Sequence, residues 1–446
     1  MGQHYIGVDF GTANTKVCVR EDVAQLATAV PWRSQTDGTE RYLIPSADNR
    51  TWTDRDPPKI ILLQRVMTAE RDEKAMTAAV EAVTTASRAA VQLVYERTGS
   101  RDHVFVLNVG FPSEFERDRG DVVHKYALIS DAVVDRLRGE LRGSGASVER
   151  GSHDLDERTA VLIHLANSRY ELSSQPMFLV DGGGYTLHMT IVRWREAHVG
   201  QPERGLSVHG GCTALHGMSH VVGSVLNALA AVRRAATTAD AIEVVEDVMG
   251  HMYAELAFGN AAPGRVPMVP TLRHTEFAKA VVHRARGAGT LVRQNPELLV
   301  ESVLTEIATF VSHPLVKHAW RTAWGPAWKH SMSKRFWEKY PLVMTGGACR
   351  IGRTKANGGV DPLAHSLREM QAAVKTADFT DVVYPELDAR FWLEERASEA
   401  LQDAMPYLFV AAGYTYPGLD WPRYVKVETV PPQAPVPLPV DPTDDG

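Results

Sequence analysis

The sequence predicts an α/β fold of two lobes with mixed sheets flanked by helices, and a mostly helical subdomain is inserted in the second lobe. Three observations predict it. Helical and strand patterns alternate along the first part of the chain. A strand that ends in aspartate and turns through glycine to threonine occurs twice, which indicates two matched lobes. The region from about residue 217 to 339 has mostly helical patterns.

The composition is that of an ordinary protein with a sizeable core. The chain has 446 residues, of which 44% are hydrophobic and 23% charged, so we expect two or three domains. A net charge of -6 gives no broad cationic field, which argues against nucleic acid or an anionic membrane as the main partner. Three scattered cysteines and the absence of a leader-like or membrane-spanning run predict a cytoplasmic protein.

The first elements follow in order from the N-terminus. Tyr5 to Asp9 and Thr15 to Val19 are β-prone runs on either side of a tight turn, which predicts a hairpin. Apolar residues then recur at helical spacing from about Lys74 to Tyr95, and a short buried strand is expected from Val104 to Val109. A charged helix should begin after residues 110–113.

The later elements repeat this plan. A strand from Met177 to Val180 ends at a glycine-rich turn and is followed by a strand from Met189 to Val192. Tyr340 to Thr345 leads into a double glycine. We expect lobe I at residues 1–170, with an insertion at about 25–103, and lobe II at 171–413, with a helical insertion at about 212–339. A final helix at about 385–413 should return towards lobe I, and residues 414–446 are expected to form a proline-rich, extended tail.

The first turn is a candidate phosphate-binding site. Asp9 ends a strand, Gly11 allows a close backbone approach, and the turn residues that can line a phosphate are Thr12, Ala13, Asn14 and Thr15. Lys16 adds charge. The same residues also make ordinary turn chemistry, so the hairpin alone leaves both interpretations open.

The second turn strengthens the hypothesis. Asp181 is followed by three glycines, which lose much backbone entropy on ordering and so favour a functional reason for their presence. Two facing turns would supply backbone N–H groups to a polyphosphate, while Asp9 and Asp181 hold a hydrated magnesium ion. The candidate residues of this turn are Gly182, Gly183, Gly184, Tyr185 and Thr186.

A third element runs from Leu342 to Ile351. Its small residues leave room for a flat base or a ribose, and its candidate binding residues are Gly346, Gly347, Ala348 and Arg350. In this order the three elements resemble the nucleotide-binding signature of the actin, sugar-kinase and heat-shock chaperone superfamily. The chain is most similar to the ATPase domain of the seventy-kilodalton heat-shock (DnaK-type) family, also at residues 104–117, 155–162 and 209–211. The similarity covers roughly residues 4 to 413, and only the three glycine motifs are specific.

The resemblance implies a two-lobed actin-like ATPase fold, built from duplicated ribonuclease-H-like domains, that binds ATP or ADP with Mg²⁺. In such a site Asp9 and Asp181 position magnesium-bound water, and Thr12 and Thr186 contact phosphates.

The same resemblance makes Glu157 the candidate that orients or activates the attacking water, and Lys59 the candidate lysine near the γ-phosphate. Arg158 stands where the family has proline. Similarity to bacterial actin-like filament proteins makes Glu116 a rival to Glu157.

Several functions remain open at this point. The first is a slow ATPase switch of the heat-shock type that acts through inter-lobe motion on a protein partner. The short segment after Gly413 leaves no room for a client-binding domain, so we expect a dedicated, partner-dependent ATPase. The alternatives are an actin-like ATPase that forms nucleotide-dependent filaments by self-association, a small-polyol kinase, and a nucleotide-binding pseudoenzyme.

Overall fold

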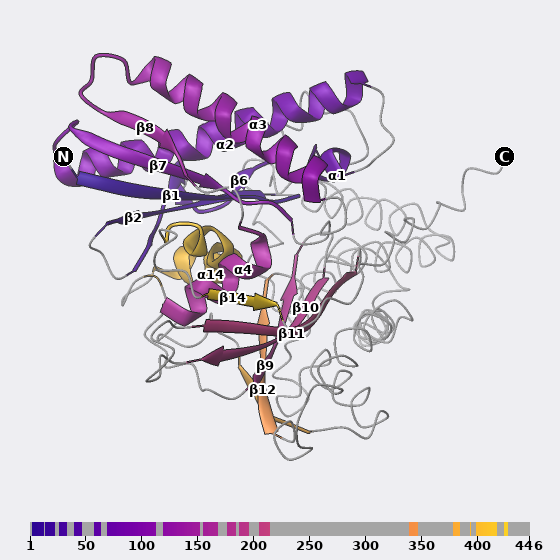
Figure 1. Ribbon diagram of the computed structural model, residues 1–446. Coiled ribbons are helices and arrows are strands. Elements are labelled where there is room, and N and C mark those ends of the chain that lie inside the picture. The colour runs from indigo at the N-terminus through magenta and orange to yellow at the C-terminus, as the bar shows by residue number, and fades with distance from the viewer. Residues whose placement is uncertain are drawn as a thin grey trace, which may run out of the picture.

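A computed structural model describes residues 2–12, 14–22, 26–33, 40–46, 58–63, 69–112, 119–151, 155–167, 176–183, 187–195, 205–214, 339–346, 378–383, 393, 398–416 and 423–426. These residues form an α/β structure with two six-stranded sheets, and helices flank the first sheet and lie between the two (Figure 1). In the described part, no helix is both long and apolar enough to cross a membrane.

The first sheet has the strand order β3-β2-β1-β7-β8, with β6 beside β2. Its central strand β1 forms an antiparallel hairpin with β2 and pairs in parallel with β7, which in turn pairs in parallel with β8. The predicted N-terminal hairpin is thus present. The strands are β1 (Gly2–Phe10), β2 (Asn14–Glu21), β3 (Thr28–Ala29), β6 (Ile44–Pro45), β7 (His103–Val109) and β8 (Ser147–Arg150). A separate two-stranded ribbon pairs β4 (Trp32–Arg33) with β5 (Glu40–Arg41).

The second sheet has the order β13-β12-β9-β10-β11-β14. Its strand β9 forms an antiparallel hairpin with β10, and β12 and β13 follow in parallel on the other side. Five of its strands therefore repeat the order and directions of the first sheet. The strands are β9 (Pro176–Gly182), β10 (Leu187–Arg195), β11 (Gly205–Ala214), β12 (Lys339–Thr345), β13 (Asp378–Val383) and β14 (Arg423–Lys426).

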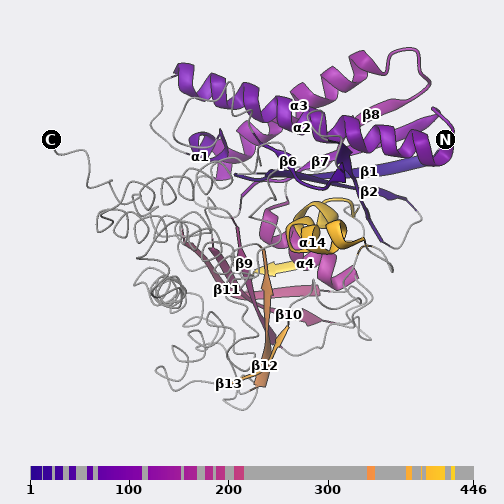
Figure 2. The same cartoon turned by 180° about the vertical axis from the view of Figure 1, so that it is seen from behind.

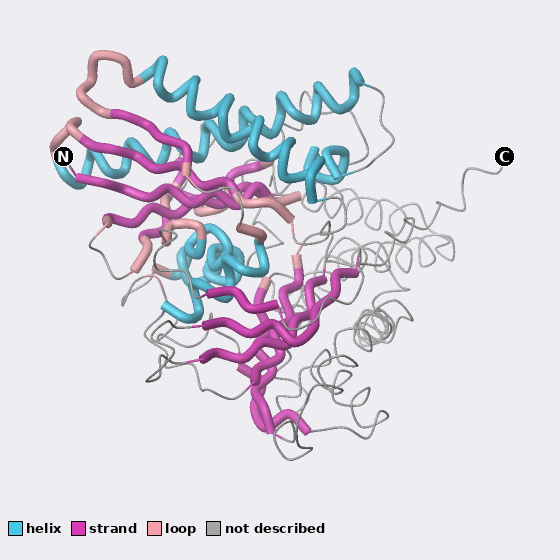
Figure 3. Tube along the Cα trace, in the orientation of Figure 1, coloured by secondary structure: helices cyan, strands magenta, loops and turns pink. Residues whose placement is uncertain are grey.

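The described helices occupy two layers. Helices α2 and α3 cover the outer face of the first sheet, and α4 and α14 lie between the two sheets (Figures 2 and 3). The helices are α1 (Pro58–Leu63), α2 (Ala69–Thr98), α3 (Arg119–Glu140), α4 (Glu157–Asn167) and α14 (Glu399–Gly413). The predicted helix at Lys74 to Tyr95 corresponds to α2, and the predicted charged helix to α3.

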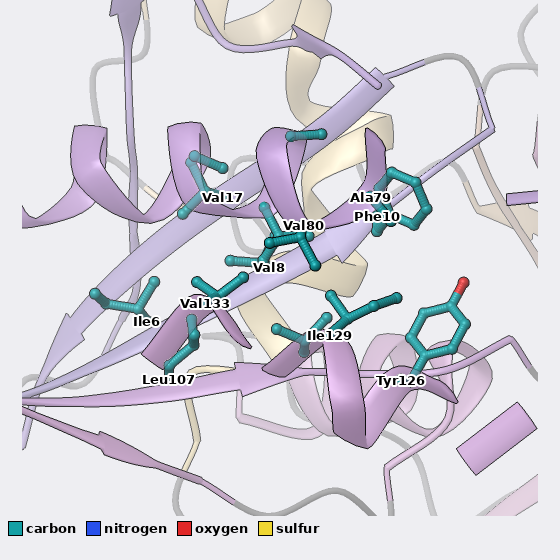
Figure 4. Close-up of a cluster of buried hydrophobic side chains, with 14 of the residues drawn as sticks. Ile6, Val8, Phe10, Val17, Ala79, Val80, Leu107, Tyr126, Ile129 and Val133 are labelled. Atoms are coloured by element: carbon teal, nitrogen blue, oxygen red, sulfur yellow. The ribbon is translucent and has the colours of Figure 1, made fainter. Parts of the chain in front are cut away.

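Alternation along β1 explains why helices cover both faces of the first sheet. Ile6, Val8 and Phe10 are buried with the apolar residues of α2 and α3 (Figure 4). Residues of the opposite parity face the other way, because successive side chains of a strand point to opposite faces. Gly7 accordingly lies against α14.

A second core joins the two sheets. Helices α4 and α14 pack against each other, and their apolar residues form one cluster with Cys18 of the first sheet and with Leu179 and Val343 of the second. Burial raises the pKa of the Cys18 thiol, and the charge of Asp9 raises it further. Cys18 is therefore a packing residue rather than a reactive thiol.

The end of α14 approaches its neighbours closely at three glycines. A Cβ at Gly7 would lie 2.1 Å from the Ala411 carbonyl oxygen, and one at Gly413 would lie 1.9 Å from the Ala160 carbonyl oxygen. A Cβ at Gly110, just after β7, would lie 1.8 Å from the ring of Tyr414. No larger residue fits at these positions unless α14 moves.

Two element boundaries in the second half of the chain differ from those expected. The final helix starts at Glu399 instead of about 385, because the side chain of Ser398 accepts a hydrogen bond from the Leu401 N–H and caps it there. The expected tail from residue 414 includes ordered structure, since β14 pairs in parallel with β11. Strand β11 runs to Ala214, close to the expected start of the helical insertion at about residue 212. The rest of that insertion, 215–338, lies outside the described residues.

The 25–103 insertion is also more integrated than expected. Helix α2 is not a separate subdomain: its buried residues Ala79, Val83 and Ala90 belong to the core of the first sheet. Its first turn contains Glu70 and Asp72, and negative charges are favourable at the N-terminus of a helix. Gly99 follows its last turn at φ +65°, a conformation in which glycine often ends a helix.

Two buried histidines occupy the other end of the first sheet. His4 Nε2 lies 3.1 Å from His103 Nδ1, and His103 Nε2 lies 2.9 Å from the Thr98 hydroxyl oxygen. The Thr98 hydroxyl donates to the Val94 carbonyl at 2.8 Å, so His103 donates to Thr98 through Nε2.

We expect Gly413→Ala to lower the free energy of unfolding by about 1–3 kcal/mol or more, because the new methyl group meets backbone atoms of α4 rather than a side chain that can move. Gly139→Ala, in α3, is the matched control, since a Cβ there meets nothing within 4 Å. It should be neutral or stabilise by up to about 1 kcal/mol. Urea unfolding of the two variants measures the difference; equal midpoints would contradict the close contact of α4 and α14.

We also expect stability to fall as the pH drops below about 6.5. Burial lowers the pKa of His4, the neighbouring His103 lowers it further, and Glu21 partly opposes both. The unfolded chain then binds more protons than the folded one below the ordinary histidine pKa, so stability rises with pH through this window and is lost on acidification. The Tyr95 ring, with Arg101 over it, also packs at this cluster.

Thermal unfolding between pH 5 and 7.5 measures this loss, which is at most about 1.4 kcal/mol per pH unit for each proton. His4→Gln should flatten the profile, whereas His124→Gln, on an exposed position of α3, should leave it unchanged. Identical profiles for wild type and His4→Gln would contradict the assignment.

Candidate functional site

The first turn places a buried carboxylate at the carboxyl end of the central strand. Asp9 lies opposite Lys16 in the β1–β2 ladder, and Lys16 Nζ donates to Asp9 Oδ2 at 2.7 Å. The two side chains are only 6% and 12% exposed. Gly11 is required sterically, since a Cβ there would lie 2.4 Å from the Asn14 carbonyl oxygen and 2.6 Å from Lys16 Nζ. The turn therefore contains a buried Asp9–Lys16 ion pair, and Gly11 packs closely against it.

Ser46, a residue that the sequence analysis missed, fixes this turn. Its hydroxyl donates to the Gly11 carbonyl at 2.7 Å and lies 3.0 Å from the Thr15 hydroxyl. Thr15 is fully buried, and its hydroxyl supports the turn from inside through this contact with Ser46. Asn14 is buried as well, and Thr12 is partly exposed. Of the predicted phosphate donors in this turn, Thr12 is the one that the described structure leaves accessible.

The second turn lies beside the third element. Asp181 of β9 pairs with Thr345 of β12, and the Thr345 hydroxyl donates to Asp181 Oδ1 at 2.9 Å. Gly346 follows at φ +81°, a conformation that favours glycine, and a Cβ there would lie 2.3 Å from the Gly182 carbonyl oxygen. The structure thus brings two of the predicted motifs together. Thr345 was missed as a site residue, although its position before a double glycine at a strand end was a usable signal.

The structure also joins the two residues that the family resemblance proposed for catalysis. Lys59, in the short helix α1, donates to Glu157 Oε1 at the start of α4, although 98 residues separate them. Their side chains are 7% and 9% exposed. A buried charge is costly unless it is paired, so each of these two residues requires a partner.

The start of α4 is tied to the end of β7. The Glu157 N–H donates to the Phe111 carbonyl at 3.0 Å, and the Phe111 N–H donates to the Leu155 carbonyl at 3.3 Å. Asp156 caps the helix, because its side chain accepts from the Thr159 N–H at 2.7 Å. Glu157 is therefore held by backbone hydrogen bonds at the carboxyl end of the first sheet.

Tyr414, which follows α14, shares this neighbourhood. It is 1% exposed, and its hydroxyl has no hydrogen-bond partner among the described residues. Burial raises the pKa of Tyr414 well above its ordinary value, and the carboxylates of Glu157, Asp9 and Asp156 raise it further. Asp9 and Glu157 therefore lie within electrostatic range of one phenol. Nothing in the local sequence around Tyr414 marked it as a site residue.

No described contact joins Asp9 to Asp181. The predicted residues that lie outside the described part of the chain are Ala13, Gly184, Tyr185, Thr186, Gly347, Ala348, Arg350 and the rival glutamate Glu116.

The donor chemistry fits a hydrated magnesium ion. Within the described residues, no group of three His, Cys, Asp or Glu side chains is placed to hold a metal directly. Mg²⁺ keeps several of its waters and uses one or two carboxylates together with phosphate oxygens, so it does not require such a group. Asp9 and Asp181 supply one carboxylate from each sheet.

Comparison with known proteins gives no further identification, since no family model matches the chain and no curated protein matches it significantly.

Proposed function

We propose that this chain binds ATP with Mg²⁺ between the two lobes of an actin-like fold, hydrolyses it slowly, and acts through inter-lobe motion on a protein partner. The site lies on the side where both central strands end, with Asp9 and Gly11 in one lobe and Asp181, Gly182 and Gly346 in the other.

One observation carries the proposal: the two hairpins match residue by residue. In each sheet the aspartate lies near the carboxyl end of the central strand, opposite the residue seven positions later, Lys16 for Asp9 and His188 for Asp181. Five strands of each sheet also share one order and one set of directions. Two equivalent turns suit a ligand held from both sides, and carboxyl ends of parallel strands are the usual place for ligands in such sheets.

The proposed roles follow from the placement of these groups. Asp9 and Asp181 hold the water shell of the magnesium ion, and Lys16 keeps Asp9 in position. When bound, a hydrated magnesium ion held there would neutralise part of the phosphate charge. Backbone N–H groups of the two glycine turns face the phosphates. Thr345 orients the carboxylate of Asp181 through its hydrogen bond.

Lys59 and Glu157 serve the hydrolytic step. The oxygen of a water forms a bond to the γ-phosphorus while the bond to the β–γ bridging oxygen breaks, giving ADP and phosphate. Glu157 orients this water and accepts its proton, which then passes to solvent. Lys59 holds the Glu157 carboxylate and adds positive charge where charge develops on the phosphoryl oxygens.

The helices between the sheets provide the mechanical link. Glu157 is the first residue of α4, α4 packs on α14, and their common core includes residues of both sheets. A change in the contacts of Glu157 on ATP binding or hydrolysis therefore acts on the helices that join the lobes, which is how lobe closure is transmitted in hinged proteins.

Asp9→Asn and Asp181→Asn should each abolish the rise in melting temperature that MgATP produces in the wild type, and should reduce phosphate release to background. Asparagine keeps the shape but loses the charge that holds a hydrated cation. Differential scanning fluorimetry and a phosphate-release assay measure the two effects, and sedimentation of the same samples tests for filaments.

Asp72→Asn is the matched control. Asp72 accepts from Lys125 at 2.9 Å on the outer helices, so this variant also breaks an ion pair but away from the strand ends. It should keep the MgATP response. If both site variants retained ATP binding and hydrolysis, the proposed site would be wrong.

Substitutions at Lys59 and Glu157 distinguish a structural role of this ion pair from a catalytic one. Lys59→Met should destabilise the protein by about 3–5 kcal/mol, because it leaves a buried carboxylate without this partner. The double variant Lys59→Met/Glu157→Met should recover most of this loss, since an apolar pair of similar volume replaces the charges.

Turnover should remain lost in the double variant, and Glu157→Gln alone should bind MgATP while hydrolysing it about a hundredfold more slowly. Chemical denaturation and single-turnover assays provide the two readouts. Recovery of turnover together with stability would show that the pair is structural only.

A further inference from the structure

The two sheets differ at one position beside their aspartates. In the second sheet, the parallel neighbour of Asp181 is Thr345, whose hydroxyl donates to the carboxylate. In the first sheet, the β1–β7 register pairs Val8 with Val109, so the next residue, Gly110, follows beside Asp9. Gly110 has no side chain that could do what Thr345 does.

The ring of Tyr414 occupies the space that Gly110 leaves. A Cβ at Gly110 would lie 1.8 Å from Tyr414 Cζ and 1.9 Å from its hydroxyl oxygen. Two contacts fix the position of Tyr414. Its backbone carbonyl accepts a hydrogen bond from Asn108 Nδ2 at 2.9 Å, and its Cβ packs near Gly7. A hydroxyl thus reaches the first sheet from α14 at the position where the second sheet has its own threonine.

This hydroxyl is buried and lacks a hydrogen-bond partner among the described residues. The carboxylates that act on it electrostatically, those of Glu157, Asp9 and Asp156, are all hydrogen-bond acceptors. A buried hydroxyl without a partner destabilises the protein, and removing it is expected to be neutral or favourable. The structure therefore carries a stability cost at the point where α14 meets the carboxylates.

We propose that Tyr414 is a positioning residue of the ATP site, whose hydroxyl donates to the Asp9 carboxylate or to a water held between Asp9 and Glu157 when magnesium and nucleotide are bound. The inference rests on the proposed function. In this role Tyr414 orients Asp9 as Thr345 orients Asp181 in the other sheet. Through this contact the end of α14 responds to the bound nucleotide.

Tyr414→Phe removes a single oxygen and tests the proposal. The melting temperature of the free protein should be unchanged or raised by about 2–4 °C, because an unpaired buried hydroxyl is removed. The rise in melting temperature with MgATP, or with magnesium and a non-hydrolysable ATP analogue, should shrink by half or more. In turnover, kcat should fall about tenfold while KM changes less than about threefold.

Tyr95→Phe is the matched control. The Tyr95 hydroxyl is also buried without a partner among the described residues, but its ring packs by His103 and Phe105 at the opposite end of the first sheet. It should have a similar effect on the free protein and none on the MgATP response or on kcat.

The outcomes are distinct. If Tyr414→Phe keeps the full MgATP shift and wild-type kcat, the inference is overturned while the proposed function stands. An equal loss in both tyrosine variants also overturns it, because the effect is then a general one of core hydroxyls. If the wild type itself shows no MgATP shift, the proposed function fails, and the inference fails with it.

Discussion

The described structure depends on the close packing of the end of α14 against its neighbours. This helix meets β1 at Gly7, α4 at its own Gly413, and the end of β7 at Gly110, in each case closer than a side chain would allow. Its other contacts include Arg20, which donates to the Thr415 carbonyl and lies over the Tyr416 ring. Because α4 and α14 share a core with both sheets, these contacts fix how the first sheet meets the second.

The polar groups of the candidate site follow from that packing. The face of the first sheet that carries α2 and α3 is apolar, whereas the face towards α14 carries Asp9, Asn108 and Arg20. Buried polar groups are unfavourable unless they find partners, and most of these do, through Lys16 for Asp9 and through backbone carbonyls for Asn108 and Arg20. The hydroxyl of Tyr414, which packs on this face, has no such partner among the described residues.

Much of the fold followed from local sequence patterns. The β1–β2 and β9–β10 hairpins, helix α2 and strands β7 and β12 were predicted because alternation and helical spacing are properties of short segments. The start of α14 was missed because the amphipathic pattern continues N-terminal to its cap at Ser398. Strand β14 was missed because four residues gain strand structure by pairing with β11, which local sequence does not encode.

The sequence by itself determined the α/β character, the two aspartate-glycine turns and the residue types of the site, since these depend on spacing and side-chain chemistry within short segments. The tertiary structure alone decided which of those residues meet. Lys59 and Glu157 are 98 positions apart, Asp181 and Thr345 are 164 apart, and Tyr414 reaches Gly110 from the end of the fold. Such contacts arise from the burial of α4 and α14 between the sheets, which is a property of the whole chain rather than of any segment.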